Sequence, residues 1–298
     1  KQSTLRASSA DIISNGPGPP VMWRVDMRER MDQEEWQALA PDLTIGAVCE
    51  ITELSFSDER LSEISDHFWK EGYFNIPAVL DEAEIAPVRD AMYALDSEGI
   101  PPVYIFLYDQ PWWLFVRLNR VIRHFLGEKF AVLPNLWAWH LRQEGARGWP
   151  PHRDCDADTV FGSGPDALLM SLSLWLPLTD TDEANGCIYV LPRSDNRNEE
   201  QASSPDKLDL LSARALPARA GSVLGWPQDL YHWGGRYSAG ARNPRLSLSL
   251  EFQNCGFDPL AEPLINAARL PPFEDRLALI GSQFRKYRHI DPLLCEGK

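Results

Sequence analysis

The chain has 298 residues, 44% of them hydrophobic, which is enough to bury one full core and lies near the upper size of a single domain. Its formal charge of −14, from 43 acidic and 29 basic residues, argues against nucleic acid as a partner because phosphate backbones would be repelled. No run of about 18 apolar residues is present, so we expect no membrane-spanning helix and no membrane partner.

Cysteine usage indicates the redox environment. The five cysteines are scattered, odd in number and never spaced C-x-x-C, which fits neither a disulfide framework nor a zinc site. The first residues also lack the basic start and apolar stretch of a signal peptide. We therefore expect a cytoplasmic protein.

Helical patterns dominate the first half of the chain. Residues 1–45 have the composition of an N-terminal extension, with one short helix expected at about 28–39. Ser57 is placed to cap a second helix, and Asp81 begins a capping-box-like pattern that opens a third. A further helix is expected at about 112–125.

Beyond residue 130 the pattern changes mainly to that of strands. Leucines alternate with polar residues over 168–178 and 245–252, so each of these strands has two chemically different faces. Shorter strands are predicted at 73–76, 130–141, 187–191 and 222–226, and a last helix at 274–287. Helices followed by many strands predict an α+β fold, mainly β with flanking helices, around a double-stranded β-helix (jelly roll, cupin-like) core. Residues 46–298 are expected to form this single domain.

The segment from about 195 to 217 is a polar insertion between two predicted strands. Long loops at the mouth of a jelly roll commonly act as lids over a bound ligand. A solvated surface loop is the alternative interpretation of the same composition.

The segment Trp149–Asp154 carries the first candidate for chemistry. On a strand, residues two apart point the same way, so His152 and Asp154 can reach one metal ion together. His232 is the best third donor, because its distance along the chain allows several strands before the chain returns beside the first. Two imidazoles and one carboxylate on one side of a metal are the ligand set of non-haem iron(II) oxygenases. The alternatives are a chance H-x-D triplet and a core histidine at position 232.

Two further groups of residues are candidates for contacting a substrate. His140 lies on the predicted strand before the H-x-D pair and is a candidate for contacting either the metal ligands or the substrate. Tyr108 and Trp113 belong to an aromatic cluster that lines either the substrate pocket or the core. The remaining histidines fall on helical or terminal stretches and are interpreted as structural: His67, His124 and His289.

Arg245 begins a predicted strand downstream of His232, and Ser247 shares its polar face. A buried guanidinium requires a partner, and a dicarboxylate such as 2-oxoglutarate provides one that a nearby hydroxyl can also bond. Fe(II) with one aspartate ligand, bound 2-oxoglutarate and Arg245 together carry no net charge. The alternative is an ion pair between Arg245 and Asp229 or Glu251.

Six short motifs occur in order between about residues 66 and 255. They are Glu71–Pro77 before a helix, His152-x-Asp154, Leu174–Asp180, Asn185–Pro192, His232 and Arg245-Leu246-Ser247. In this order they resemble the phytanoyl-CoA dioxygenase family of iron(II)/2-oxoglutarate-dependent oxygenases. The resemblance implies Fe(II) as cofactor, 2-oxoglutarate and O2 as co-substrates, a small-molecule substrate, and metal binding by His152, Asp154 and His232.

The resemblance also implies roles for residues around the metal. Arg245 with Ser247 would bind the co-substrate carboxylate, and Trp175 would lie beside it. Arg193 stands where the chain departs from the family's Pro-Gly-Ser-His motif, which places it near the substrate.

Two finer points follow from the same resemblance. The family's other co-substrate contact, on the strand before the H-x-D pair, falls on either Arg142 or Gln143. Asp154 is present, whereas halogenating relatives replace that carboxylate, so the resemblance implies oxygenation.

We therefore predict a 2-oxoglutarate-dependent non-haem iron dioxygenase that hydroxylates a small-molecule metabolite with release of succinate and CO2. One rival is a jelly-roll metalloenzyme without oxygen chemistry, such as a cupin-type isomerase, in which Arg245 and Ser247 would have no role. The other is a non-catalytic binding module, whose sign would be a missing metal ligand, and none is missing. The sequence does not indicate an oligomeric state.

Overall fold

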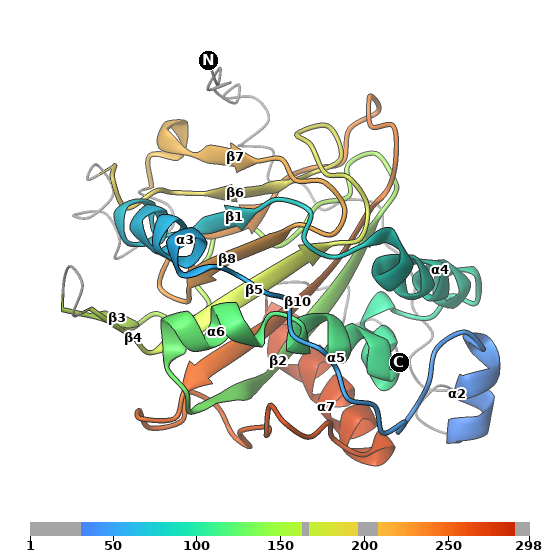
Figure 1. The fold of residues 1–298 in the computed structure, drawn as a ribbon. Helices are drawn as coiled ribbons and strands as arrows, with labels where there is room; N and C mark the ends of the chain where they lie inside the picture. The colour runs from blue at the N-terminus through green and yellow to red at the C-terminus, as the bar shows by residue number, and fades with distance from the viewer. Residues whose placement is uncertain (1–30, 163–166, 196–207, 290–298) are drawn as a thin grey trace.

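Two antiparallel sheets form the centre of the computed structural model, which describes residues 31–162, 167–195 and 208–289 (Figure 1). The larger sheet has five strands in the order β1-β8-β5-β10-β2, and the smaller has three in the order β7-β6-β9. A separate hairpin pairs β3 with β4. In the described part of the chain these sheets do not join into a closed barrel. The α+β class and the two-sheet jelly-roll core are as the sequence predicts.

The strands of the large sheet are β1 (Phe74–Ile76), β2 (Phe130–Leu141), β5 (Ser171–Pro177), β8 (Val223–Pro227) and β10 (Arg245–Asn254). Those of the small sheet are β6 (Ile188–Val190), β7 (Arg214–Leu216) and β9 (His232–Gly234), and the hairpin consists of β3 (Val160–Phe161) and β4 (Leu168–Leu169). The helices are α2 (Gln33–Leu39), α3 (Asp58–Glu71), α4 (Glu82–Ser97), α5 (Asp109–Val116), α6 (Asn119–Leu126) and α7 (Phe273–Lys286). Short 3₁₀ helices span Pro102–Leu107, Leu210–Ser212 and Tyr287–His289.

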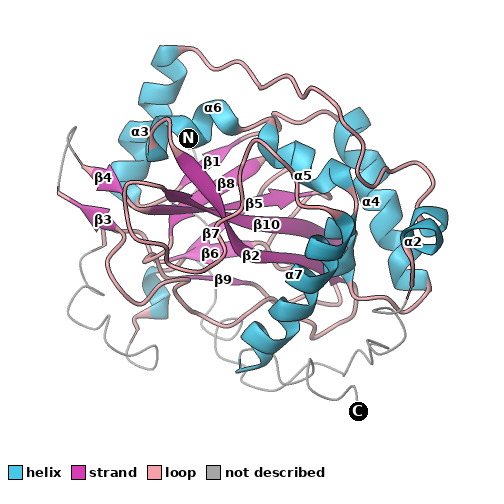
Figure 2. Cartoon of the chain, turned by 90° about the horizontal axis from the view of Figure 1, so that it is seen from below, coloured by secondary structure: helices cyan, strands magenta, loops and turns pink. Residues whose placement is uncertain are grey.

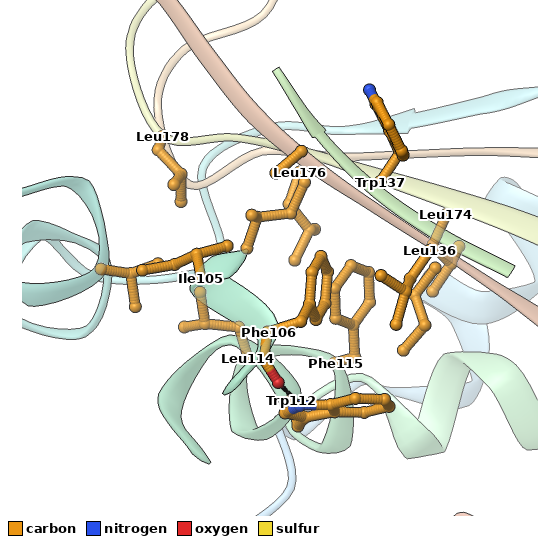
Figure 3. Packing of buried hydrophobic residues seen from close by; sticks show 14 of the residues in the cluster. Ile105, Phe106, Trp112, Leu114, Phe115, Leu136, Trp137, Leu174, Leu176 and Leu178 are labelled. Carbon is orange, nitrogen blue, oxygen red and sulfur yellow. Dashed lines mark hydrogen bonds between the residues drawn. The ribbon is translucent and has the colours of Figure 1, made fainter. Parts of the chain in front are cut away.

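The helices and the small sheet lie on opposite sides of the large sheet (Figure 2). Because side chains alternate along a strand, each central strand contributes one row of residues to the helical side and one row to the space between the sheets. Figure 3 shows Leu136 and Leu174 pointing toward Phe115 in the helical layer, while Trp137 points the other way. The alternating leucines of β5 and β10 thus build the core, and their polar neighbours face the small sheet.

The caps of two helices form as the sequence predicts. The Ser57 hydroxyl accepts a hydrogen bond from the backbone N–H of Arg60 at the start of α3. At the start of α4, the Asp81 backbone N–H donates to the Glu84 carboxylate in a capping box. The predicted stripe of α4 is buried: Ile85, Val88, Met92 and Leu95.

Several predicted elements are interrupted or shorter. The helix expected at 112–125 is two helices, α5 and α6, because the Arg117 carbonyl accepts a hydrogen bond from Leu54 N, at 2.8 Å. The strand expected at 168–178 breaks at Met170, whose N–H donates to the Thr159 carbonyl at 2.8 Å. In both cases a long-range backbone bond, invisible to local periodicity, replaces the next bond of the element.

The N-terminal residues that the structure describes pack onto the helical layer. The helix expected at 28–39 begins only at Gln33, behind a capping box formed by Asp32 and Glu35. The Trp36 ring is fully buried and stacks on Tyr104 with a centroid separation of 5.1 Å. The described part of the predicted extension therefore shares the core of the domain, and residues 1–30 lie outside the described residues. The domain boundary at 45/46 stays a prediction.

The predicted insertion at 195–217 is partly described. Residues 196–207 lie outside the described residues, and those after them form a short 3₁₀ helix followed by β7, which pairs with β6. The last part of the segment is therefore a strand, where the sequence suggested only a loop. Among the described helices, none has the length and apolar character needed to cross a membrane.

Candidate metal centre

His152 and His232 are held together by their own backbones. The N–H of each residue donates to the carbonyl of the other, with N···O distances of 3.1 and 3.0 Å. The two imidazole centroids lie 4.3 Å apart. His232 begins β9, whereas His152 lies in a loop that makes only this one bridge. The prediction of a regular strand at the H-x-D pair is therefore wrong, because Pro150 and Pro151 have no N–H with which to extend a ladder.

The tautomers of both histidines are set by backbone carbonyls. His152 Nδ1 lies 2.7 Å from the Pro150 carbonyl oxygen, and His232 Nδ1 lies 3.0 Å from that of Leu230. A carbonyl oxygen can only accept, so in each ring Nδ1 carries the proton and Nε2 presents a lone pair. His152 Nε2 is buried and has no hydrogen-bond partner among the described residues. Such fixing of the ring through its other nitrogen is typical of metal-binding histidine.

Asp154 completes the cluster. Its Oδ2 accepts a hydrogen bond of 2.6 Å from the Ser173 hydroxyl and one of 3.4 Å from the Trp226 indole N–H. Its Oδ1 lies 3.5 Å from Nε2 of His152 and 3.7 Å from Nε2 of His232. The three donor atoms all lie within 4.8 Å of one another. The predicted residues therefore converge on one point with the donor set of a 2-His-1-carboxylate iron site.

The electrostatics of the cluster suit a dication. Burial lowers the pKa of His232 to about 4, so its imidazole is neutral at neutral pH and available as a ligand. Burial alone would raise the pKa of Asp154, but the charges and hydrogen bonds of His232, His152 and Ser173 reverse this and hold that pKa well below its usual range. An ionised carboxylate beside the neutral imidazole of His232 fits a divalent metal, since each ligand must bind without its proton.

A cavity of about 450 Å³, open to solvent, lies beside these donors, between the two sheets. Side chains of β2, β5, β8 and β10 form one wall, and β6 and β9 contribute to the other. The lining is rich in tryptophan: Trp139, Trp149, Trp175 and Trp226. Apolar walls with a few convergent polar groups are the usual composition of a small-molecule site.

Arg245 lies at the wall of this cavity and is 1% exposed. Its Nη1 donates to the Gly186 carbonyl at 2.6 Å, and its guanidinium lies 5.8 Å from the Trp139 ring centroid and 5.9 Å from that of Trp175. Among the described residues no carboxylate oxygen lies within 4.0 Å of it, and its Nε has no partner. Burial lowers the pKa of Arg245 only to about 10, so the group stays charged at neutral pH.

The two carboxylates considered as partners of Arg245 are engaged elsewhere. Asp229 pairs with Arg193 at 2.6 Å, and Glu251 accepts hydrogen bonds from side-chain amides. Ser247, two residues along the same face of β10, is fully buried, and its hydroxyl has no partner among the described residues. Trp175 lines the cavity with its indole N–H likewise unpartnered. The arrangement leaves a cation and two hydrogen-bond donors without protein acceptors.

Other predicted substrate residues lie away from the cavity. His140 faces the helical side of β2, where its ring packs against Tyr93 and lies 3.4 Å from Asp96, because the neighbouring Trp139 takes the cavity side. Tyr108 is fully buried in the helical core, where its hydroxyl donates to the Trp36 carbonyl at 2.6 Å.

The remaining three groups are likewise displaced. Trp113 is on α5, in the helical layer. The Arg193 guanidinium is tied to Asp229 and does not line the cavity. Arg142 pairs with Asp96 at 3.1 Å on the exposed end of β2, and Gln143 is also exposed. The sequence predicted a second co-substrate contact from Arg142 or Gln143, near the end of β2. The alternation of β2 instead directs Trp139 into the cavity.

Glu251 is one of the cavity residues that sequence reasoning missed as site residues, together with Ser173 and Trp226. It is 8% exposed and lies on the cavity face of β10 together with Arg245 and Ser249. Its position on the polar face of an alternating strand was a signal, but the sequence suggested it only as a partner for Arg245.

These residues place a three-donor cluster, an unpaired arginine and an aromatic cavity between two jelly-roll sheets. Residues 102–243 match the phytanoyl-CoA dioxygenase (PhyH) family. The PhyH region contains His152, Asp154 and His232, and it ends two residues before Arg245. The resemblance read from the six motifs is thereby confirmed.

Solved structures share the fold of this chain. SnoN, a non-heme α-ketoglutarate-dependent epimerase from nogalamycin biosynthesis, has a TM-score of 0.54 and 18% identity over 72% of this chain and 98% of its own. HygX from Streptomyces hygroscopicus, with iron bound, has a TM-score of 0.51 and 16% identity over 69% of this chain and 90% of its own. SnoK, a carbocyclase from the same biosynthesis as SnoN, has a TM-score of 0.50 and 16% identity, covering 71% and 97%. At these identities the likeness establishes the fold. No curated protein matches the sequence.

Proposed function

We propose that this protein is an Fe(II)/2-oxoglutarate-dependent dioxygenase in which His152, Asp154 and His232 hold the metal. One observation carries the proposal: two Nε2 lone pairs and one carboxylate oxygen converge beside a cavity that also holds a buried, unpaired arginine. The PhyH match and the shared fold of iron-dependent enzymes support it.

The metal ligands would be oriented by their surroundings. Pro150 and Leu230 fix the histidine rings through Nδ1, and Ser173 holds Oδ2 of Asp154 so that Oδ1 faces the ion. Three protein ligands on one side leave the rest of the coordination sphere for other groups. Iron(II) and 2-oxoglutarate bound there would activate dioxygen, which is the oxidant for both 2-oxoglutarate and the substrate, with succinate and CO2 as co-products.

Arg245 and Ser247 would bind the distal carboxylate of 2-oxoglutarate. A guanidinium grips a carboxylate through two parallel hydrogen bonds, and the unpartnered Ser247 hydroxyl can add a third. The negative charge of that carboxylate would also neutralise the buried guanidinium of Arg245, which pairs with no carboxylate of the described residues. Trp139 and Trp175, on either side of the guanidinium, exclude water and strengthen this ion pair.

We propose hydroxylation of a small molecule as the outcome. Asp154 occupies the ligand position that halogenating relatives leave without a carboxylate, which favours oxygenation. A cupin-type isomerase is disfavoured because it would leave Arg245 without a counter-charge. A non-catalytic module is disfavoured because all three metal ligands are present.

An anaerobic titration with Fe(II) and 2-oxoglutarate tests the proposal. The wild-type protein should develop the weak visible charge-transfer band of the iron–2-oxoglutarate chelate. Arg245→Ala should weaken 2-oxoglutarate binding by about 10-fold or more, the size of a charged hydrogen bond. Arg142→Ala removes an exposed arginine from the same sheet and serves as the matched control. Absence of the band, with 2-oxoglutarate affinity unchanged in Arg245→Ala, contradicts the proposal.

A further inference from the structure

Glu251 lines the same cavity as Arg245 and lies at the end of this face of β10 that is level with the metal cluster. In the pairing of β10 with β5 it is directly opposite Ser173, the residue that holds Asp154. Arg245 is six residues earlier on the same face, which is a separation of roughly 20 Å along an extended strand. A 2-oxoglutarate held by Arg245 therefore leaves Glu251 to face whatever else enters the cavity.

The hydrogen bonds of Glu251 are one-sided. The side-chain amides of Asn135 and Gln228 both donate to Oε2. Oε1 accepts no hydrogen bond from any described residue. The two amides orient the carboxyl group while leaving one oxygen available to a ligand.

Among the described residues, no cationic group contacts the Glu251 carboxylate directly, although Lys286 acts on it from a distance. No described lysine, arginine or histidine nitrogen lies within 4.0 Å of its carboxylate, and the ammonium group of Lys286 contacts Asn135 Oδ1 instead. An ionised buried carboxylate without a cation is costly. Burial and the nearby charge of Asp154 raise the pKa of Glu251 to about 8, against the opposing effects of Lys286 and the two amides. Without a bound cation the carboxyl group therefore keeps its proton at neutral pH, and a bound ammonium group would take the place of that proton.

The neighbouring walls accommodate a cation. Trp149 lines the same cavity, packs against the Tyr287 ring at 4.3 Å and lies 5.7 Å from the ring of His152. The faces of such rings attract ammonium groups. Trp139 and Trp175 lie against the guanidinium of Arg245, which leaves Trp149 and Trp226 as the other tryptophans of the cavity lining that could contact a cation.

We propose that Glu251 Oε1 binds a protonated amine of the substrate, and that the substrate class of this enzyme is therefore amine-bearing small molecules. The inference rests on the function proposed above for the same cavity. With the metal cluster, 2-oxoglutarate and Arg245 neutral in sum, an ionised Glu251 leaves one negative charge, which an ammonium group neutralises. An alcohol of the same shape supplies no positive charge, so Glu251 would keep its proton and the charge-assisted hydrogen bond would not form.

The test compares benzylamine with benzyl alcohol as probes of the anaerobic Fe(II)·2-oxoglutarate complex, using isothermal titration calorimetry at neutral pH. The wild-type protein should bind benzylamine about 10-fold or more tightly than benzyl alcohol, the range expected for a hydrogen bond between charged groups. Glu251→Gln, which keeps the size of the side chain, should abolish this preference. Glu128→Gln removes an equal charge from an exposed side chain and should preserve it.

The outcomes separate the two proposals. The charge-transfer band of the chelate reports on the proposed function and should form in both variants. If the band forms and wild-type protein binds the amine no better than the alcohol, or fails to bind it, the amine proposal is overturned while the function stands. A preference that survives in Glu251→Gln overturns it as well. If the band itself does not form, the proposed function fails first.

Discussion

Two buried arginines lie on opposite sides of the large sheet and differ in their hydrogen-bond and ion-pair partners. Arg276, on the helical side, is 2% exposed and pairs with Asp109 at 2.7 Å, with further bonds to the carbonyls of Leu107 and Pro271. Arg245, on the cavity side, is 1% exposed and bonds only the Gly186 carbonyl. Both carry a buried charge, but among the described residues only Arg276 pairs with a carboxylate.

The difference distinguishes a structural ion pair from a binding group. Asp109 is itself satisfied, since it also accepts from the Thr44 hydroxyl and from the backbone N–H groups of Gly46 and Ala47. Arg276 thus locks the N-terminal segment and α7 onto the helical layer. Arg245 lies in an equally rigid setting but keeps donors unpaired, at a cost in stability that a bound carboxylate would offset.

The largest predicted effect is the loss of stability on replacing Arg276, compared with the same replacement of Arg245. Arg276→Met should lower the free energy of unfolding by about 3–5 kcal/mol, because it leaves Asp109 buried and uncompensated. Arg245→Met should change it by less than about 1 kcal/mol in the ligand-free protein. Urea unfolding measures both. Equal losses in the two variants would show that Arg245 is structural and would remove the contrast.

Addition of 2-oxoglutarate with metal should stabilise the wild-type protein more than the Arg245→Met variant. A ligand that binds only the folded state raises stability with the logarithm of its concentration relative to Kd, by about 2.7 kcal/mol at 100 times Kd. Relative to metal alone, this gain should appear in the wild-type protein and be smaller by about 1.4 kcal/mol or more in Arg245→Met, because the ligand binds at least about 10-fold more weakly. An undiminished gain in Arg245→Met would place the co-substrate elsewhere.

Removal of a metal ligand comes next. His232→Ala should weaken Fe(II) binding by more than the roughly 10–100-fold typical of changes to groups that merely orient a ligand. His140→Ala, a histidine on the helical side of β2, is the control and should leave Fe(II) affinity unchanged. Anaerobic titration with a competing chelator measures both. Similar losses in the two variants would contradict the assignment.

Ser173 tests the support of the cluster. Ser173→Ala should weaken Fe(II) binding by roughly 10-fold, because Asp154 Oδ2 loses its hydroxyl partner and the carboxylate is less well oriented. Ser171→Ala, two residues earlier on β5, is the matched control. An unchanged affinity in Ser173→Ala would mean that Trp226 alone orients the carboxylate.

The last prediction concerns pH. Glu251 has a pKa of about 8 in the folded protein against 4.5 for an ordinary glutamate, so the folded state keeps a proton that the unfolded state releases between these values. Stability of the metal-free protein should therefore fall as pH rises from about 4.5 to 8, and Glu251→Gln should flatten this slope by up to about 1.4 kcal/mol per pH unit. Urea unfolding across this range measures the slope. An identical slope in the variant would show that Glu251 ionises normally.

The sequence predicted the central strands because their periodicity is strong. β2 has the predicted bounds, Phe130–Leu141, and the alternation over β10 separates Leu248 from Ser247 as expected. Element ends were less predictable: the break between α5 and α6 depends on Leu54, whose partner is far away in the sequence. Periodicity reports local burial, whereas such breaks are set by long-range backbone bonds.

For the candidate site, the order of the motifs predicted that His152, Asp154 and His232 bind one metal ion, and the three side chains do lie together. The amino-acid sequence by itself determined the two-faced strands and the supply of a 2-His-1-carboxylate set, because donor chemistry and alternation are properties of the residues. Only the tertiary structure decided which polar groups stay unpaired. It turned His140 away from the cavity and paired Asp229 with Arg193. Among the described residues it left the Arg245 guanidinium without a carboxylate and one oxygen of Glu251 without a hydrogen-bond donor. Pairing of a buried charge depends on which strands meet, and that information is distributed over the whole chain.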